Sequence, residues 1–305
     1  MSKYGFPLQF GLSVSPATSR LPQLLELVQA ADQAGLDFIA IQDHPYNRTF
    51  MDTWTLIAYL AGRTGRVRFF PDVANLPLRP PAMLAKSAAT LDRLSGGRVE
   101  LGLGGGAYWD AITAMGGPQL ASPGDAVAAT AEAIQVIRLA WSGERGVSFD
   151  GRFYQLHGYQ PGPEPAHPMG IWVGAARPRM LRLTGRLADG WVAPMNLYLP
   201  PEKVPAAQAI IDAAARQAGR SPSAIRRIAN ISGHIGPGSL GAEGLSGPAG
   251  AWAETLDDWA GGLGFDTFIY WPQTASPAQV ERFANEVVPA VRAAAGPSPA
   301  GVSRE

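Results

Sequence analysis

His44 is the side chain near a predicted strand end that is best suited to chemistry. It lies next to Asp43, shortly after the apolar segment 38–41. An imidazole titrates near neutral pH, so His44 can donate a hydrogen bond or a proton to a bound ligand. The alternative is a structural histidine in a turn that the neighbouring aspartate fixes. We take His44 as the candidate catalytic residue and Asp43 as part of the same site.

Two loops of small residues offer backbone N–H groups to an anion or a flat ring. Gly104, Gly105 and Gly106 remove side-chain bulk where the chain leaves a predicted strand. The second loop opens a predicted helix, whose N-terminal N–H groups and dipole favour a phosphate. Its residues are Gly174, Ala175, Ala176 and Arg177. Either loop alone is compatible with a simple turn, whereas the two together predict a phosphate-bearing cofactor.

Other reaction classes lack their residues in this sequence. There is no cysteine, which excludes disulfides, thiolate metal sites and cysteine nucleophiles. No Ser-His-Asp series, carboxylate pair or metal-ligand cluster stands out, so we expect no metal site. The only lysines are Lys3, Lys86 and Lys203, and all lie away from the predicted strand ends. A Schiff-base aldolase or a metal-dependent sugar isomerase is therefore disfavoured.

These loops need strands whose ends meet, and short apolar runs alternate with helical patterns along the chain. The predicted strands are 8–14, 38–41, 67–73, 99–103, 171–173, 191–193, 228–231 and 267–270. The predicted helices are 21–34, 54–61, 81–94, 123–141, 178–187, 204–218, 252–263 and 280–295. Eight strand-then-helix units predict an α/β fold of the (β/α)₈ barrel type, which gathers the C-terminal strand ends into one mouth.

We expect a single domain over residues 1–305, because no change of composition marks a boundary. The segments predicted to be irregular are 143–168, with a short hairpin around Asp150, the glycine-rich loop 236–250, which we expect to be mobile, and the tail from 296. His157 and His167 lie in the first of these and are expected to be solvated. A doubly wound open sheet is the competing fold, and the lack of a G-x-G-x-x-G run after the first strand disfavours it.

Charge and hydropathy restrict the partners. Lys plus Arg and Asp plus Glu are 25 each, so the chain has no basic field for nucleic acid or an anionic membrane. Hydrophobic residues make up 46%, yet no apolar run reaches the roughly 18 residues of a membrane span. We therefore expect a cytoplasmic protein without a signal peptide, acting on a small molecule.

Several sequence runs along the whole chain match one family. The most specific is the run from Thr90 to Arg98, TLDRLSGGR, which leads into a strand ending at Gly104. The other runs are Asp43-His44-Pro45-Tyr46, Asn75-Leu76-Pro77-Leu78-Arg79-Pro80-Pro81, Val173-Gly174-Ala175 and Ala188-Asp189-Gly190-Trp191. With these runs the chain resembles the bacterial-luciferase-like flavin-dependent oxidoreductases.

The resemblance implies a (β/α)₈ barrel with insertions over its C-terminal mouth, and frequent formation of a homodimer. It implies FMN or the deazaflavin coenzyme F420, bound with its ring in the mouth. A cis peptide bond supports the ring in this family, and the matching motif puts it at Asp72-Val73, close to Asn75. The cofactor phosphate is implied near Gly104–Gly106, Gly174–Arg177 and Asn196.

Coenzyme F420 is the favoured cofactor, because Asp43-His44 and the run from Asn75 to Arg79 look like the deazaflavin-dependent branch. The implied reaction is hydride transfer to or from a small, apolar organic substrate. With FMN, the alternative is a two-component monooxygenase that needs a separate flavin reductase. A flavin-binding protein without turnover is the alternative from another class.

The candidate substrate-binding residues are aromatic or follow strand ends: Tyr108, Trp109, His234 and Trp271. Some deazaflavin-dependent sugar-phosphate dehydrogenases carry a glutamate at the place of Ala107. This chain therefore departs from their pattern, unless Asp110, three residues further on, replaces that glutamate.

Overall fold

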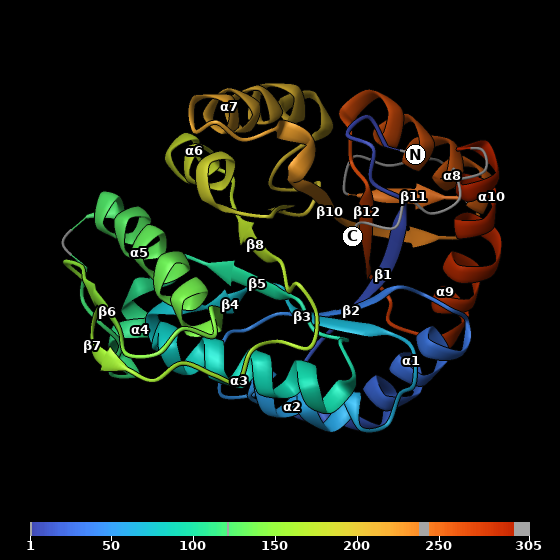
Figure 1. Ribbon diagram of the computed structural model, residues 1–305. Coiled ribbons are helices and arrows are strands. Elements are labelled where there is room, and N and C mark those ends of the chain that lie inside the picture. The colour runs from blue at the N-terminus through green and yellow to red at the C-terminus, as the bar shows by residue number, and fades with distance from the viewer. Residues whose placement is uncertain (1, 121, 238–243, 296–305) are drawn as a thin grey trace.

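Parallel strands close into a barrel at the centre of the molecule, with helices around it (Figure 1). This computed structural model describes residues 2–120, 122–237 and 244–295. Neighbouring strands follow the order β3-β2-β1-β12-β10-β9-β8-β5-β4. A parallel bridge joins Phe69 of β3 to Val99, which lies just before β5, and so closes the barrel. The strands are β1 (Gln9–Val14), β2 (Phe38–Ile41), β3 (Arg68–Pro71), β4 (Ala74–Asn75), β5 (Leu101–Gly104), β8 (Ile171–Gly174), β9 (Gly190–Ala193), β10 (Arg226–Ile235) and β12 (Thr267–Pro272).

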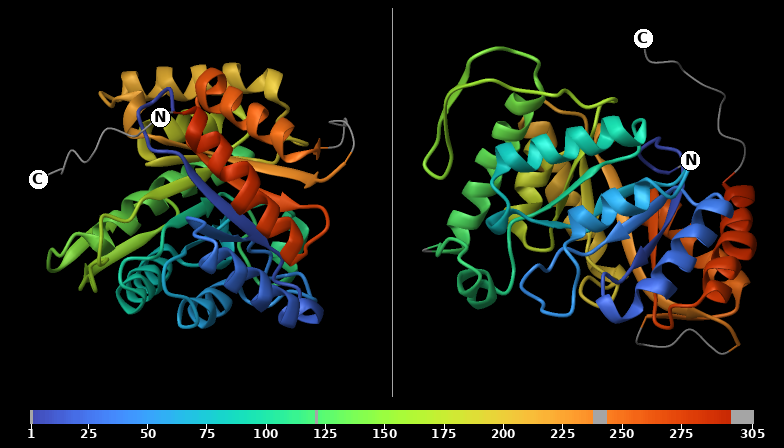
Figure 2. Two further views of the ribbon diagram at one scale, coloured as in Figure 1. Left: turned by 90° about the vertical axis from the view of Figure 1, so that its right-hand side faces the viewer. Right: turned by 90° about the horizontal axis from the view of Figure 1, so that it is seen from below.

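The helices lie outside the strands, as two further views show (Figure 2). Local signals start and stop them: Asp52 accepts from the backbone N–H of Thr55 to cap α2, and Gly96 ends α3 in the left-handed region with φ 73°. The helices are α1 (Leu21–Gln33), α2 (Thr53–Ala61), α3 (Pro81–Ser95), α4 (Trp109–Ala114), α5 (Pro123–Trp141), α6 (Pro178–Leu187), α7 (Val204–Gln217), α8 (Ala249–Asp258), α9 (Pro277–Arg282) and α10 (Val288–Ala294).

The predicted barrel is confirmed, and its elements lie where the apolar patterns placed them, with shifted ends. The predicted strand 67–73 is interrupted: β3 ends at Pro71 and β4 begins at Ala74, with Asp72 and Val73 between them. The predicted helices 252–263 and 280–295 each contain a π-helical stretch, at Trp259–Leu263 and Phe283–Val287.

The glycine-rich segment 236–250 is not only a loop, contrary to the prediction. A short strand, β11 (Leu245–Gly247), pairs in parallel with the end of β10. The contact is close, because a Cβ atom on Gly233 would lie 2.0 Å from the carbonyl oxygen of Leu245. Propensity rules do not predict such a strand, because glycine is rare in strands. Residues 238–243 and the tail from 296 lie outside the described residues.

The predicted hairpin is confirmed as the antiparallel pair β6 (Val147–Asp150) and β7 (Gln155–Tyr159), which stands apart from the barrel beside α5 (Figure 1). The Glu132 carboxylate on α5 accepts the backbone N–H groups of residues 152–154. Arg152 also pairs with Asp125 at 2.9 Å. The hairpin therefore packs along α5.

His167 is only partly exposed, with 26% of its side chain accessible, whereas the prediction had it solvated. Its Nδ1 lies 3.0 Å from Asp92 Oδ2 and its Nε2 lies 3.3 Å from Glu100 Oε1. Hydrogen bonding to Glu100, and then to Asp92, raises the pKa of His167 above its usual value. The histidine thus ties the chain just before β8 to two carboxylates that are almost fully buried.

The barrel interior is filled by side chains and is not a pore. Phe38, Phe70 and Trp172 meet edge to face, with ring centroids 5.1–5.8 Å apart. Val73 and Trp271 pack on this cluster. A ligand must therefore bind above this apolar plug, at the C-terminal ends of the strands.

Candidate active site

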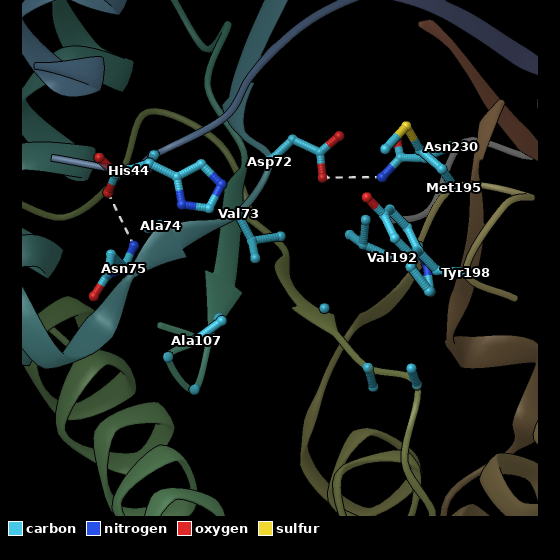
Figure 3. A pocket seen from close by; sticks show the side chains of 18 of the residues that line it. His44, Asp72, Val73, Ala74, Asn75, Ala107, Val192, Met195, Tyr198 and Asn230 are labelled. Atoms are coloured by element: carbon cyan, nitrogen blue, oxygen red, sulfur yellow. Dashed lines mark hydrogen bonds between the residues drawn. The ribbon is translucent and has the colours of Figure 1, made fainter. Parts of the chain in front are cut away.

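A cavity of about 390 Å³ opens at the C-terminal ends of the barrel strands (Figure 3). That volume lies in the range of small-molecule and cofactor sites. The lining residues are Asp43, His44, Tyr46, Asp72, Val73, Ala74, Asn75, Gly104, Gly105, Gly106, Ala107, Gly174, Ala175, Ala176, Val192, Pro194, Met195, Tyr198, Asn230 and Trp271. Most of the residues predicted from sequence are thus brought together, from several different strand ends and the loops after them.

Asp43 holds the loops of the site together. Its carboxylate receives both Nε and Nη2 of Arg79, at 2.6 and 2.7 Å, and the backbone N–H of Asn75 at 2.9 Å. Figure 3 marks the last of these bonds. Arg79 continues to Asp52 at 2.6 Å. Because these bonds occupy both oxygens of Asp43, its role in the structure is to fix the loop that carries His44.

His44 projects its ring into the cavity, on the side of Asp72 and Val73 (Figure 3). Its Nδ1 lies 2.7 Å from the Tyr46 hydroxyl, and no bond to a described residue is seen at Nε2. Burial lowers the pKa of His44, although the neighbouring Asp43 acts in the opposite direction. At neutral pH the imidazole is therefore uncharged and has one nitrogen free for a ligand.

The Asp72-Val73 peptide bond is cis, at the position that the resemblance implied. Asp72 is buried, and its Oδ1 accepts from Asn230 Nδ2 at 3.2 Å (Figure 3). Trp271 Nε1 in turn donates to Asn230 Oδ1 at 3.0 Å. Burial raises the pKa of Asp72 to about 7. This chain of bonds fixes the Trp271 ring at the cavity wall.

The cavity floor suits a flat ring. Val73 rises from the floor, and a Cβ atom on Gly104 or Gly174 would lie 2.7 or 3.0 Å from its Cγ2. The two glycines therefore leave just enough space for this valine. Beside it, the buried Asn75 Oδ1 has no hydrogen-bond partner among the described residues. An unpaired amide oxygen next to an apolar platform fits a heteroaromatic ring that carries N–H donors.

A second cavity of about 560 Å³ adjoins the first. The two share Gly105, Gly106 and the segment 174–176 as lining. The predicted residues Trp109 and Arg177 line this second cavity and not the first. Arg179 and Arg182 of α6 line it too, and no described carboxylate pairs with these arginines. The N-terminus of α6 and these guanidinium groups make this cavity suitable for anionic groups.

Some predicted residues lie outside the first cavity. Asn196 exchanges two hydrogen bonds with the backbone of Ser232, so it joins the loop after β9 to β10. His234 lies within β10, which extends beyond its predicted end. Tyr108 is 69% exposed at the rim and packs on His44, with ring centroids 5.8 Å apart. Asp110 is exposed on α4 and does not line either cavity.

Sequence reasoning missed other lining residues, chiefly Tyr46, Asn230, Met195 and Tyr198. Asn230 carried a usable signal, because a polar residue inside the apolar run 228–231 must face something polar. Tyr46 was part of the matched motif but had no predicted role. Among residues 2–120, 122–237 and 244–295, no group of three His, Cys, Asp or Glu could hold a metal ion. Nor does any described helix have the length and apolarity to cross a bilayer.

The fold and this site define a cofactor-binding barrel, and comparison with known proteins places it in a family. Residues 3–262 match the family described as luciferase-like monooxygenase. The chain therefore belongs to that family, as its sequence runs implied.

Named relatives are identical to this chain at about 30% of the aligned residues. It is 31% identical over 227 residues to F420-dependent glucose-6-phosphate dehydrogenase of Kineococcus radiotolerans, covering 71% of this chain and 66% of the relative. It is 30% identical over 226 residues to 5,10-methylenetetrahydromethanopterin reductase of Archaeoglobus fulgidus, covering 74% and 64%. The matched part thus spans slightly less than two thirds of these relatives' own length.

Solved structures share the fold. An F420-dependent secondary alcohol dehydrogenase, in complex with an F420-acetone adduct, superposes with a TM-score of 0.82 at 20% identity, covering 94% of this chain and 99% of that one. The oxygenating constituent of a 3,6-diketocamphane monooxygenase of Pseudomonas putida, in complex with FMN, gives 0.71 at 17% identity, covering 93% and 99%.

Proposed function

We propose that this protein is an oxidoreductase that binds the deazaflavin coenzyme F420 and transfers hydride to or from a small, neutral organic substrate. The observation that carries the proposal is the pairing of two adjoining cavities, one with an apolar platform and the other with arginines that pair with no described carboxylate. The F420-dependent names among the relatives support the same cofactor.

The residues of the first cavity fit the ring of such a cofactor. Val73 forms the platform, and Asn75 Oδ1 offers an acceptor that no described residue uses. When bound, a deazaflavin supplies or accepts a hydride and leaves oxygen chemistry largely suppressed. The protein has to orient the ring and exclude water, and it needs no further redox group of its own.

The second cavity favours F420 over FMN. FMN ends in a single phosphate, whereas F420 continues from its phosphodiester into glutamate residues that carry further carboxylates. Arg177, Arg179 and Arg182 can meet several negative charges, and together they exceed what one phosphate needs. The segment 174–176 lines both cavities and carries only small side chains, so an extended anionic ligand can contact its backbone in both cavities.

His44 holds the proton that the proposed reaction requires. Its Nε2 faces the cavity, so it can donate a hydrogen bond to a substrate oxygen. Met195, Tyr198 and Trp271 line the remaining wall, and none of them carries a charge. This lining favours a small alcohol or carbonyl compound over a sugar phosphate, in line with alanine at position 107 and the exposed Asp110.

The wider setting of the enzyme is also part of the proposal. We propose a homodimer in the cytoplasm, built from a single domain over residues 1–305. The loop glycines 104–106, the segment 174–177 and Asp43, Asp72, Val73 and Asn75 make the cofactor site. Asn196 acts on it by holding the loop after β9. Tyr108 and Trp109 shape the entrance, and His234 has no part in binding the ring.

The test is a titration of the purified protein with F420 and, separately, with FMN, followed by ring fluorescence. We expect micromolar binding of F420, and reduction of bound F420 with one or more members of a panel of secondary alcohols. His44→Ala should bind F420 within a few-fold of the wild type and lose most of its turnover. His157→Ala is the matched control, because His157 does not line either cavity.

Each alternative has its own outcome in this experiment. Tight binding of FMN alone would favour a monooxygenase that depends on a separate flavin reductase. F420 binding without turnover by any donor or acceptor would favour a cofactor carrier. If neither ring binds, the proposed function is wrong.

A further inference from the structure

Tyr46 makes the one side-chain contact that the His44 ring nitrogens have among the described residues. The Tyr46 hydroxyl lies 2.7 Å from His44 Nδ1, with the ring centroids 5.6 Å apart. Tyr108 packs against both rings, at 5.8 Å from His44 and 6.1 Å from Tyr46. The backbone of Tyr108 has φ 58°, in the left-handed region that residues other than glycine rarely adopt. The three rings thus form a small aromatic cluster at the cavity edge.

The direction of the hydrogen bond follows from the acceptors that Tyr46 can reach. Its single hydroxyl proton has two acceptors, His44 Nδ1 at 2.7 Å and the Ala107 carbonyl oxygen at 3.5 Å. The shorter contact is within the normal range for a hydrogen bond and the longer one is at its limit. The proton therefore points to Nδ1. In a neutral imidazole that accepts at Nδ1, the ring proton is on Nε2.

The surrounding charges leave this arrangement undisturbed. The Asp43 carboxylate is occupied by Arg79 and by the backbone of Asn75, and Arg79 is shared with Asp52. Asp72 faces the ring from the floor of the cavity and bonds to Asn230. Burial, with Tyr108 and Asp43 adding to it, raises the pKa of Tyr46 to about 12, so the phenol keeps its proton. Burial also lowers the pKa of His44, so the imidazole stays neutral.

We propose that Tyr46 is a positioning residue, which donates its hydroxyl proton to His44 Nδ1 and so fixes His44 as an Nε2–H donor aimed into the cavity. The substrate group that fits this donor is an oxygen acceptor, such as a carbonyl or the oxygen of an alcohol. The inference deepens the proposed function and rests on it for the identity of the substrate. The tautomer itself can be measured without any ligand.

The test is nitrogen NMR of the imidazoles in the full-length protein without cofactor, labelled with ¹⁵N-histidine. The chain has four histidines, and His44→Gln identifies the His44 signals. In the wild type we expect a protonated Nε2 and an Nδ1 that accepts a hydrogen bond. In Tyr46→Phe, the Nδ1 signal should move to the position of a nitrogen without a hydrogen bond. The ratio of the two tautomers should fall about fivefold, the factor that one ordinary hydrogen bond supplies.

The control is Tyr108→Phe, which keeps the ring contact and removes a hydroxyl that makes no bond to His44. It should leave the His44 signals unchanged. A wild-type spectrum with the proton on Nδ1 would overturn the proposal, because Tyr46 would then accept from His44 and donate to Ala107. An unchanged His44 spectrum in Tyr46→Phe would overturn it too. Failure of the proposed function shows separately, as loss of F420 binding in a wild type whose His44 tautomer is as expected.

Discussion

Replacing Asp43 by asparagine removes the negative charge of the carboxylate that accepts the hydrogen bonds between the loops of the site. The carboxylate receives three N–H donors, two from Arg79 and one from the backbone of Asn75. An amide presents one oxygen and one NH₂ group. Whichever way the new amide turns, its NH₂ must face at least one of those donors, so a buried N–H group is left without an acceptor.

The size of the effect follows from burial. The Asp43 side chain is 1% exposed and that of Arg79 is 17% exposed, so the pair is largely shielded from water. Breaking a buried ion pair costs about 3–5 kcal/mol when one charge is left alone. Arg79 keeps Asp52 as a second partner, and we therefore expect a loss of about 2–3 kcal/mol in the free energy of unfolding. For 305 residues this lowers the melting temperature by about 3–5 °C.

The assay is equilibrium unfolding in urea, with thermal melting as a second measurement. Asp52→Asn is the matched control: it also removes one carboxylate from Arg79, but that side chain is 43% exposed. An asparagine can still cap α2, and exposed ion pairs contribute about 0–1 kcal/mol, so the control should lose less than about 1 kcal/mol. Equal losses in the two variants would refute the argument from burial.

Three further predictions concern other parts of the molecule. His167→Gln should cost most stability below about pH 6.5, the usual pKa of histidine. Since the folded-state pKa of His167 is raised, the pH-dependent part of this loss should disappear as the pH rises through that pKa, which urea unfolding at several pH values can follow. Gly104→Ala should push Val73 aside and weaken ring binding at least tenfold in a fluorescence titration, whereas Gly65→Ala, with nothing within 4 Å of the added methyl, should not. Arg182→Ala should weaken the binding of F420 several-fold and the binding of FMN little, and added salt should reduce that difference between the two cofactors. An equal loss of affinity for both cofactors would show that Arg182 does not bind the F420 tail.

The barrel could be predicted because its signal is repeated. Each strand is a short apolar run, and each helix has a continuous apolar face, so errors at the ends do not change the topology. The missed elements have no such signal. β11 has three residues and comes from a glycine-rich stretch, where close backbone contact and not side-chain packing makes the strand.

Site residues could be predicted only where the ends of the strands were predicted correctly. Asn75, Gly104 and Gly174 are the last residues of their strands and His44 lies shortly after β2, and the barrel brings them together. His234 was misplaced because β10 continues to Ile235, so residues predicted to follow the strand still belong to it. The role of Tyr46 depends on a side-chain distance, which no spacing in the sequence can supply.

Asp43 and His44 are neighbours in sequence, yet the structure gives them opposite tasks. Every acceptor site that Asp43 uses is committed to the scaffold, through Arg79 and the backbone at Asn75. With its bonds made to these donors, the carboxylate makes no hydrogen bond to the adjacent imidazole among the described residues. His44 is left with a neutral hydroxyl as its partner and with burial as the main influence on its pKa. The bonds of Asp43 to the scaffold thus allow His44 to act as a neutral hydrogen-bond donor.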